Sequence, residues 1–171
     1  MDLSYHLTTG NSDLIDDVRS KGIITDSQLF VGLKSEEIAG ILENAYEKEF
    51  ETNQVIIKEG DPLKGLSIII DGETSIQKKN NMTGKIVELK IRGKGESLGE
   101  MTLIDSGAAS VTVRAKSDVK IAIINLKYLT TAFKENPRMR GDVAINIAKI
   151  LSKRLRQATA YSAAKTGLKR Y

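Results

Sequence analysis

Short stretches in which apolar and polar residues alternate dominate the middle of this 171-residue chain. Turn-forming residues such as Asp71-Gly72 and Gly93-Lys94-Gly95 separate these stretches. A period of two predicts β-strands with one buried and one solvated face. About eight strands at this spacing favour a rolled or closed antiparallel barrel of the jelly-roll type, which leaves few free strand edges. The apolar positions of the five clearest stretches are Val55/Ile57, Leu66/Ile68/Ile70, Val87/Leu89/Ile91, Val111/Val113/Ala115 and Val119/Ile121/Ile123.

A helix is predicted ahead of these strands, beginning at Ser35. The Ser35 side chain can cap a helix N-terminus, and Glu36 and Glu37 place acidic groups in the first turn. Apolar residues then follow at helical spacing, namely Ile38, Ile41, Leu42 and Ala45. The fold class predicted is therefore mainly β with flanking helices.

A longer helix is predicted after the strands, over residues 137–160. Pro137 suits the first turn of a helix, and no proline follows it. The apolar face is too wide for one contact, so part of it is expected to cover the barrel and part to pair with the same helix of a second copy in a homodimer. The alternative is that the whole face packs within one chain. The residues expected at the dimer contact are Ala144, Ala148, Leu151 and Leu155.

The two ends of the chain differ from the β-domain predicted over residues 29–136. Residues 1–28 are predicted to be a separate attachment with a short helix from Ser12 to Val18, ended by Gly22. Residues 161–171 are expected to be a flexible basic tail. Residues 138–171 hold nine Lys or Arg against one acidic residue, giving +8, so the rest of the chain is at −4. Such a basic end can bind nucleic acid, anionic lipid or an acidic partner, or it can be the solvated face of a helix.

Composition excludes several classes of function. The chain has no cysteine and a single histidine, so disulfides, thiolate metal sites and multi-histidine metal clusters are excluded. The sequence shows no Ser/His or Cys/His catalytic pair and no Gly-Lys-Ser/Thr phosphate loop, so an enzyme is not expected. No stretch approaches the ~20 apolar residues of a membrane span, and no secretory signal is visible, so a cytoplasmic location is expected.

Residues 98–113 carry the most specific motif of the chain. Leu98-Gly99-Glu100 is followed by Asp105-Ser106-Gly107-Ala108-Ala109-Ser110 and then by Val111-Thr112-Val113. This segment, hereafter the cassette, resembles the phosphate-binding cassette of cyclic-nucleotide-binding domains. In that family an aromatic-Gly-Glu motif, a short helix and a loop precede Arg-(Ala/Ser/Thr)-Ala-Thr-Val. The residues that match are Gly99, Glu100, Ser110, Thr112 and Val113.

The resemblance extends over about residues 28–159. Leu29-Phe30-Val31-Gly32-Leu33 is similar to the family's Phe-x-x-Leu entry helix. Glu59-Gly60-Asp61 and Ile69-Ile70-Asp71-Gly72-Glu73 are similar to its Glu-Gly-Asp and Ile-x-x-Gly-Glu motifs. This likeness implies a sensor module of the kind found in catabolite activator protein and in kinase regulatory subunits, with a β-roll followed by a long helix.

The resemblance also implies a binding site for a cyclic nucleotide. In the family, backbone N–H groups of the short helix and a bidentate arginine bind the cyclic phosphate, while the Gly-Glu carboxylate accepts from the ribose hydroxyl. In this chain Ala109 stands where that arginine is expected. Losing such a contact typically costs ~2–5 kcal/mol of binding free energy. If ligand binding is retained, the expected binding residues are Gly99, Glu100, Met101, Ala109, Ser110 and Thr159.

Two interpretations of Ala109 stay open. Arg92 and Arg154 are the cations that could replace the missing arginine, in which case the chain is a sensor of a cyclic nucleotide or cyclic dinucleotide with altered selectivity. Otherwise Glu100 caps the short helix as a structural acid. The chain is then a non-enzymatic regulatory or scaffold protein that acts through a protein partner, with no cofactor.

Sequence-specific DNA binding is not expected. Twelve residues follow Thr159, whereas a helix-turn-helix domain after the long helix takes some sixty. The basic residues alone can bind a phosphate backbone only without sequence preference.

Overall fold

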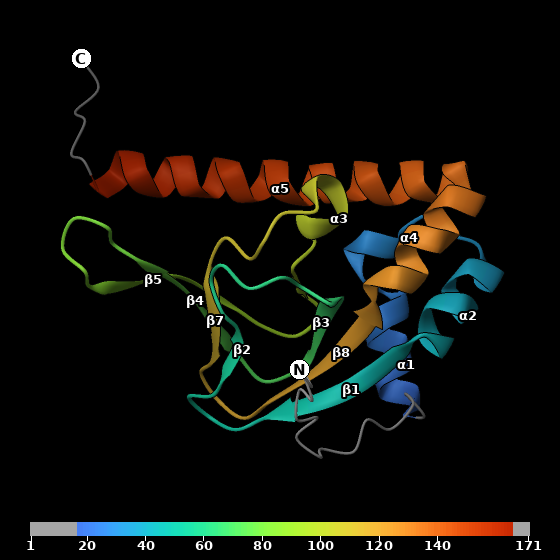
Figure 1. Cartoon of the computed structure of the whole chain (residues 1–171), viewed down its shortest axis with the longest axis horizontal. Helices are drawn as coiled ribbons and strands as arrows, with labels where there is room; N and C mark the ends of the chain where they lie inside the picture. Colours follow the sequence, from blue (N-terminus) through green and yellow to red (C-terminus); the bar gives the residue numbers. More distant parts are fainter. Residues whose placement is uncertain (1–16, 166–171) are drawn as a thin grey trace, which may run out of the picture.

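Two four-stranded antiparallel sheets form the centre of the molecule (Figure 1). The computed structural model describes residues 17–165. One sheet has the strand order β1-β8-β3-β6 and the other β2-β7-β4-β5. This arrangement confirms the predicted antiparallel β-roll. The strands are β1 (Ala45–Phe50), β2 (Val55–Ile57), β3 (Gly65–Asp71), β4 (Thr74–Lys79), β5 (Ile86–Arg92), β6 (Ser97–Leu98), β7 (Thr112–Ala115) and β8 (Val119–Asn125).

Helices cover one face of the first sheet. In Figure 1, α1, α2 and α4 gather at one end of the β-roll, and α5 crosses above it. Among the described residues, no helix combines the length and the apolar character needed to span a membrane. The helices are α1 (Val18–Thr25), the 3-10 helix η1 (Gln28–Phe30), α2 (Ser35–Glu43), α3 (Thr102–Asp105), α4 (Leu126–Glu135) and α5 (Pro137–Lys165).

Strands β3 and β8 lie between two apolar cores. Leu66, Ile68 and Ile70 pack against the helices, whereas Ile69 and Ile121 point into the β-roll. Because both faces of β3 are covered, its residues from Leu66 to Ile70 are all buried, and its sequence is an almost continuous apolar run.

The part of the predicted N-terminal attachment that the structure describes packs into the helix-side core. Ile24 and Leu29 are fully buried in the helix-side core. The helix begins at Val18, capped by Asp17, and continues through Gly22, so the predicted stop at Gly22 is wrong. Residues 12–16 of the predicted helix lie outside the described residues.

The first strand does not share the alternating pattern of the others. Its first residue, Ala45, is predicted in the preceding helix, but α2 ends at Glu43 and Ala45 begins β1, where it pairs with Ile124. The sequence Ala-Tyr-Glu-Lys-Glu-Phe lacks β-branched residues and has charged residues at its centre, so its extended conformation depends strongly on pairing with β8.

The long helix α5 is fixed to the core at its start. Met139, Val143 and Ile147 are buried against the helix-side core. Arg138 also pairs with the buried carboxylate of Glu37 on α2. Burial alone would raise the pKa of Glu37, but hydrogen bonds from Arg138, from the Lys34 backbone and from Asn136 outweigh it and lower that pKa.

The second half of α5 extends over the β-roll. The helix passes α3 and continues beside the β4–β5 hairpin (Figure 1). It runs to Lys165, so the predicted boundary between helix and flexible tail at residue 160 is placed too early.

Candidate ligand-binding site

The cassette folds back on the β-roll through a glycine and two backbone hydrogen bonds. Gly99 has φ +82°, and a Cβ atom there would lie 2.8 Å from Leu63 Cδ1, so the position requires glycine. The Ala109 N–H donates to the carbonyl oxygen of Asp61 over 2.9 Å, and the Gly60 N–H donates to that of Ala109 over 2.8 Å. These bonds hold the cassette loop against the turn that follows β2.

A cavity of about 370 Å³ lies between the cassette, the β-roll and α5. Its volume is in the range of small-molecule sites. Apolar side chains such as Ile57, Leu98 and Val113 form its floor, and Leu151, Leu155 and Ala158 form the wall contributed by α5.

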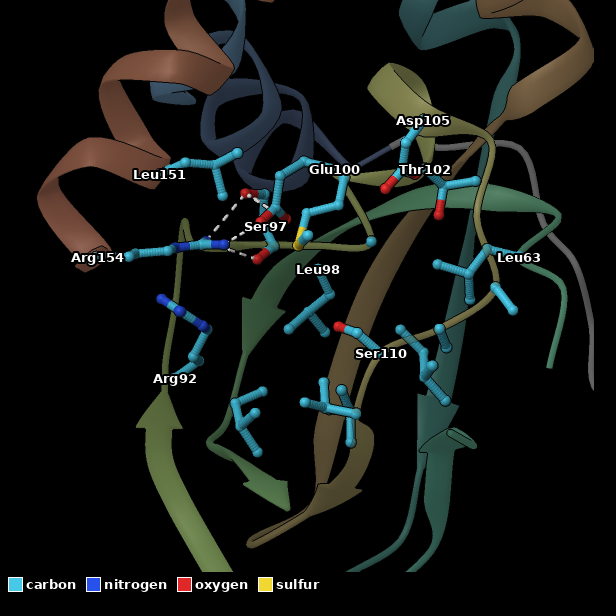
Figure 2. Close-up of a pocket in the computed structure, with 18 of the residues that line it drawn as sticks. Leu63, Arg92, Ser97, Leu98, Glu100, Thr102, Asp105, Ser110, Leu151 and Arg154 are labelled. Carbon is cyan, nitrogen blue, oxygen red and sulfur yellow. Dashed lines mark hydrogen bonds and ion pairs between the residues drawn. The ribbon is translucent and has the colours of Figure 1, made fainter. Parts of the chain in front are cut away.

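Glu100 is buried at one wall of this cavity and is neutralised by α5. Its side chain is 4% exposed, and Arg154 Nη1 donates to Oε1. Ser97 Oγ donates to Glu100 Oε2 over 3.2 Å, while Arg154 Nη2 donates to the Ser97 carbonyl oxygen over 3.1 Å. Figure 2 shows the three side chains joined in this cluster. The ion pair therefore connects α5 directly to the cassette.

Two arginines lie together on this side of the cavity. Burial lowers the pKa of Arg154; Glu100 opposes this, and the nearby charge of Arg92 adds to the lowering. Arg92 is 11% exposed and pairs with Glu96 over 2.6 Å. Both guanidinium groups are thus already engaged with carboxylates of the chain.

The opposite side of the cavity carries negative charge. Figure 2 shows Leu63, Thr102 and Asp105 across the cavity from Arg92 and Arg154. Ala109 lines the cavity, as does Asp105, which accepts from the Gly107 N–H over 2.9 Å. Among the described residues that line the cavity, the cations are Arg92 and Arg154. The cassette side of the cavity therefore carries the Asp105 carboxylate, and Ala109, where the resemblance implies a cation, is uncharged.

The cavity brings together most of the residues expected at the site. Gly99, Glu100, Met101, Ala109 and Ser110 line it, with the two candidate cations. Thr159 does not line it: its hydroxyl donates to the Leu155 carbonyl oxygen within α5, and the preceding Ala158 faces the cavity instead.

Sequence reasoning did not name several residues of this site, among them Leu63, Ser97 and Asp105. The only signal for Asp105 was its place within the cassette. Leu63 gave none, because it reaches the cavity from a turn distant in sequence.

The residues predicted for a dimer contact lie at the edge of the packed face of α5. Leu151 is half-buried, packs against the core and lines the cavity. Leu155 also lines the cavity but is 68% exposed, and Ala148 is exposed. Ala144 is half-buried, while Ile145 next to it is 56% exposed. The exposed residues Ile145, Ala148 and Ser152 form an outward stripe on α5. This stripe is centred on Ala148 rather than on Leu151.

Sequence relatives share the β-roll and adjoining segments. The chain is 30% identical to the cyclic AMP receptor protein of Thermus thermophilus over 133 residues, which are 77% of this chain and 59% of that protein. It is also 30% identical to the cAMP-dependent protein kinase regulatory subunit of Emericella nidulans, over 60% of this chain and 24% of that protein. The chain therefore spans less than two thirds of either relative.

Solved structures share the fold. A cyclic nucleotide-binding domain from Methylobacillus flagellatus superposes with a TM-score of 0.74 at 23% identity, covering 90% of this chain and 85% of that one. The catabolite activator protein of Thermus thermophilus superposes with a TM-score of 0.66 at 26% identity, covering 82% and 63%.

The family model of the cyclic nucleotide-binding domain matches residues 47–136. This range contains all of the cassette and the strands that support it. The chain belongs to the cyclic nucleotide-binding domain family.

Proposed function

We propose that this chain is a non-enzymatic regulatory module in which the cavity has lost the family's affinity for a cyclic phosphate, and which acts by binding a protein partner. The observation that carries this proposal is the charge on the cassette side of the cavity. Ala109 provides no cation there, and Asp105 provides a carboxylate.

The electrostatics of the cavity oppose a cyclic nucleotide in the usual orientation. A cyclic phosphate brings a full negative charge out of water, which is favourable only when a cation or several donors replace the water. At the cassette it would find no cation, and the exposed carboxylate of Asp105 on the same side of the cavity would repel it. Arg154 and Arg92 lie across the cavity and already pair with Glu100 and Glu96.

Relatives of the chain support a regulatory role of this fold. Those described above are a cyclic AMP receptor protein and the regulatory subunit of a protein kinase. In this chain the Arg154–Glu100 pair joins α5 to the cassette through groups of the chain itself. We therefore infer that α5 is kept in one position, as a surface for a partner needs.

Titration calorimetry with cyclic AMP, cyclic GMP and cyclic dinucleotides tests the proposal. We expect no saturable heat at ligand concentrations up to about 1 mM, where the binding free energy is only about −4 kcal/mol. Micromolar binding of any of these ligands would contradict the loss of cyclic-phosphate affinity.

A second candidate function rests on the cavity itself. An apolar cavity of about 370 Å³ with a few polar groups is the usual form of a small-molecule site. Such a ligand would be neutral or cationic near Asp105 and would donate to Glu100, whose oxygens keep free lone pairs. The same titration separates this sensor from the partner-binding module if neutral nucleosides are included, because only the sensor gives heat.

We propose further that the outward stripe of α5 joins two copies in a homodimer. Ala148 and Ser152 are exposed, so their substitution does not disturb the core. Ala148→Glu with Ser152→Glu places four carboxylates at the contact of two helices. We expect light scattering to give a dimer mass for the wild type and a monomer mass for this variant.

A matched control adds the same charge elsewhere. Met82 is 96% exposed and Thr131 is exposed on α4, so Met82→Glu with Thr131→Glu should keep the dimer mass. A monomeric wild type, or a dimer unaffected by the α5 variant, would rule out this contact.

A further inference from the structure

A second cavity, of about 360 Å³, lies beside the first. Three parts of the chain form it: the segment 26–28, which runs from the end of α1 into the first residue of η1, the hairpin 90–97 and the face of α5 from 150 to 157. Arg92, Ser97 and Arg154 line both cavities, so they form the wall between them.

Positive charge dominates the lining of this second cavity. Two acidic residues, Asp26 and Glu96, face five basic ones, which leaves an excess of three positive charges. The first cavity, by contrast, is mostly apolar. The basic residues of the second cavity are Lys90, Arg92, Lys94, Lys153 and Arg154.

Two of these basic side chains have no ion-pair partner among the described residues. Lys94 and Lys153 form no ion pair with any residue between 17 and 165, whereas Arg92 pairs with Glu96 and Arg154 with Glu100. Each of the two lysines comes from a different element, the β5–β6 turn and α5 respectively. Like charges held in one concave site raise the local positive potential, which an anion relieves.

Hydrogen bonds hold the walls of the second cavity in place. Lys90 Nζ donates to Gln157 Oε1 over 2.7 Å and ties the hairpin to α5. Within the turn, the Gly93 N–H donates to Glu96 Oε2 over 2.9 Å. The same carboxylate pairs with Arg92, so the arginine is already oriented. A ligand entering here therefore finds the hairpin and α5 already held together, and the side chains that it must order are those of Lys94 and Lys153.

We propose that this second cavity binds a phosphate-bearing small molecule. The phosphate lies between Lys94 and Lys153, and the remaining donors of Arg92 and Arg154 face it from the shared wall. Lysine ammonium groups suit this role because they bind phosphate as compact charges with three donors each. The three-sided enclosure fits a small molecule better than a nucleic acid strand or a membrane surface, which would need an extended basic face.

Titration of the full chain with inorganic pyrophosphate tests this site. We expect saturable binding to the wild type in low salt, weakened as ionic strength rises. Lys94→Gln with Lys153→Gln should weaken it by about tenfold or more, because both contacts are charge-assisted. Both lysines are exposed and unpaired within the described part of the chain, so the variant keeps the fold. Circular dichroism verifies this.

Two control variants locate the binding. Lys134→Gln with Lys149→Gln removes the same charge from exposed positions outside the second cavity and should leave the affinity within about twofold. Ala158→Phe fills the α5 wall of the first cavity and should also leave pyrophosphate binding unchanged. No saturable binding, an equal loss in the lysine control, or a loss in Ala158→Phe would each overturn the proposal. Cyclic nucleotides also carry phosphate, so the same variants assign any heat that they give: Ala158→Phe alters the lining of the first cavity but not of the second, and Lys94→Gln with Lys153→Gln that of the second but not of the first.

Discussion

Ala109→Arg combined with Asp105→Asn is expected to create cyclic AMP binding. Ala109 lines the cavity, and its backbone is fixed by hydrogen bonds to the turn at residues 60–61. An arginine there supplies the cation that the cassette lacks. Restoring one charge-assisted contact in a partly buried site is worth about 2–5 kcal/mol, or ~30-fold to several-thousand-fold in affinity.

The second substitution matters because Asp105 lines the same side of the cavity. In Ala109→Arg alone, Asp105 can pair with the new guanidinium and take the place of the phosphate. We therefore expect a smaller gain in cyclic AMP affinity from this single variant. The asparagine side chain of Asp105→Asn keeps an oxygen that accepts from the Gly107 N–H, which preserves the loop.

Ala109→Met with Asp105→Asn is the matched control for this experiment. It adds a long side chain without charge and should give no cyclic AMP binding by calorimetry. An arginine variant that binds no better than the methionine variant would show that the cavity is unsuited to cyclic AMP for a reason other than charge.

Arg154→Met is expected to destabilise the chain by ~3 kcal/mol, because it leaves the Glu100 carboxylate buried with only Ser97 as a side-chain donor. The estimate lies at the low end of the usual ~3–5 kcal/mol for a broken buried pair. Arg154 is 21% exposed, so water offsets part of the loss.

Adding Glu100→Gln to Arg154→Met should return the free energy of unfolding to within about 1 kcal/mol of the wild type. Removing both charges also removes the desolvation cost, so the double variant is much more stable than additivity predicts. Urea unfolding of the wild type, both single variants and the double variant measures this cycle. Additive effects would show that Arg154 and Glu100 do not depend on each other.

Much of the β-roll was predictable because its strands obey local rules. Leu66, Ile68 and Ile70 alternate as a buried face requires, and Asp71-Gly72 forms the turn to β4. β5 shows the limit of this reasoning. Val87, Leu89 and Ile91 alternate in the same way, yet they are 40%, 56% and 36% exposed. Periodicity identifies a strand, but whether a partner layer covers it is decided by tertiary structure.

The candidate site was predictable only where the cassette motif carried it. Glu100 and Ala109 were located from the motif, and the cavity contains both. Arg154 was a candidate because of its helix, but its partner could not be inferred, since it is 54 positions from Glu100 and the strands β7 and β8 lie between them. The sequence did not predict that the Asp105 carboxylate lines the cavity, because this depends on how the loop folds and not on the type of residue.

The position of α5 makes it a lever. Its first half is held in the core by Met139, Val143 and Ile147, and its second half crosses the cavity and ends at Lys165. From residue 147 to its end the helix is ~27 Å long at ~1.5 Å per residue. A tilt of about 10° around the buried end would move the far end by ~5 Å, while the Arg154 contact, nearer the pivot, would shift by only ~2 Å. Breaking the Arg154–Glu100 contact would therefore free the far end of α5 to move about 2.5 times as far as the contact itself.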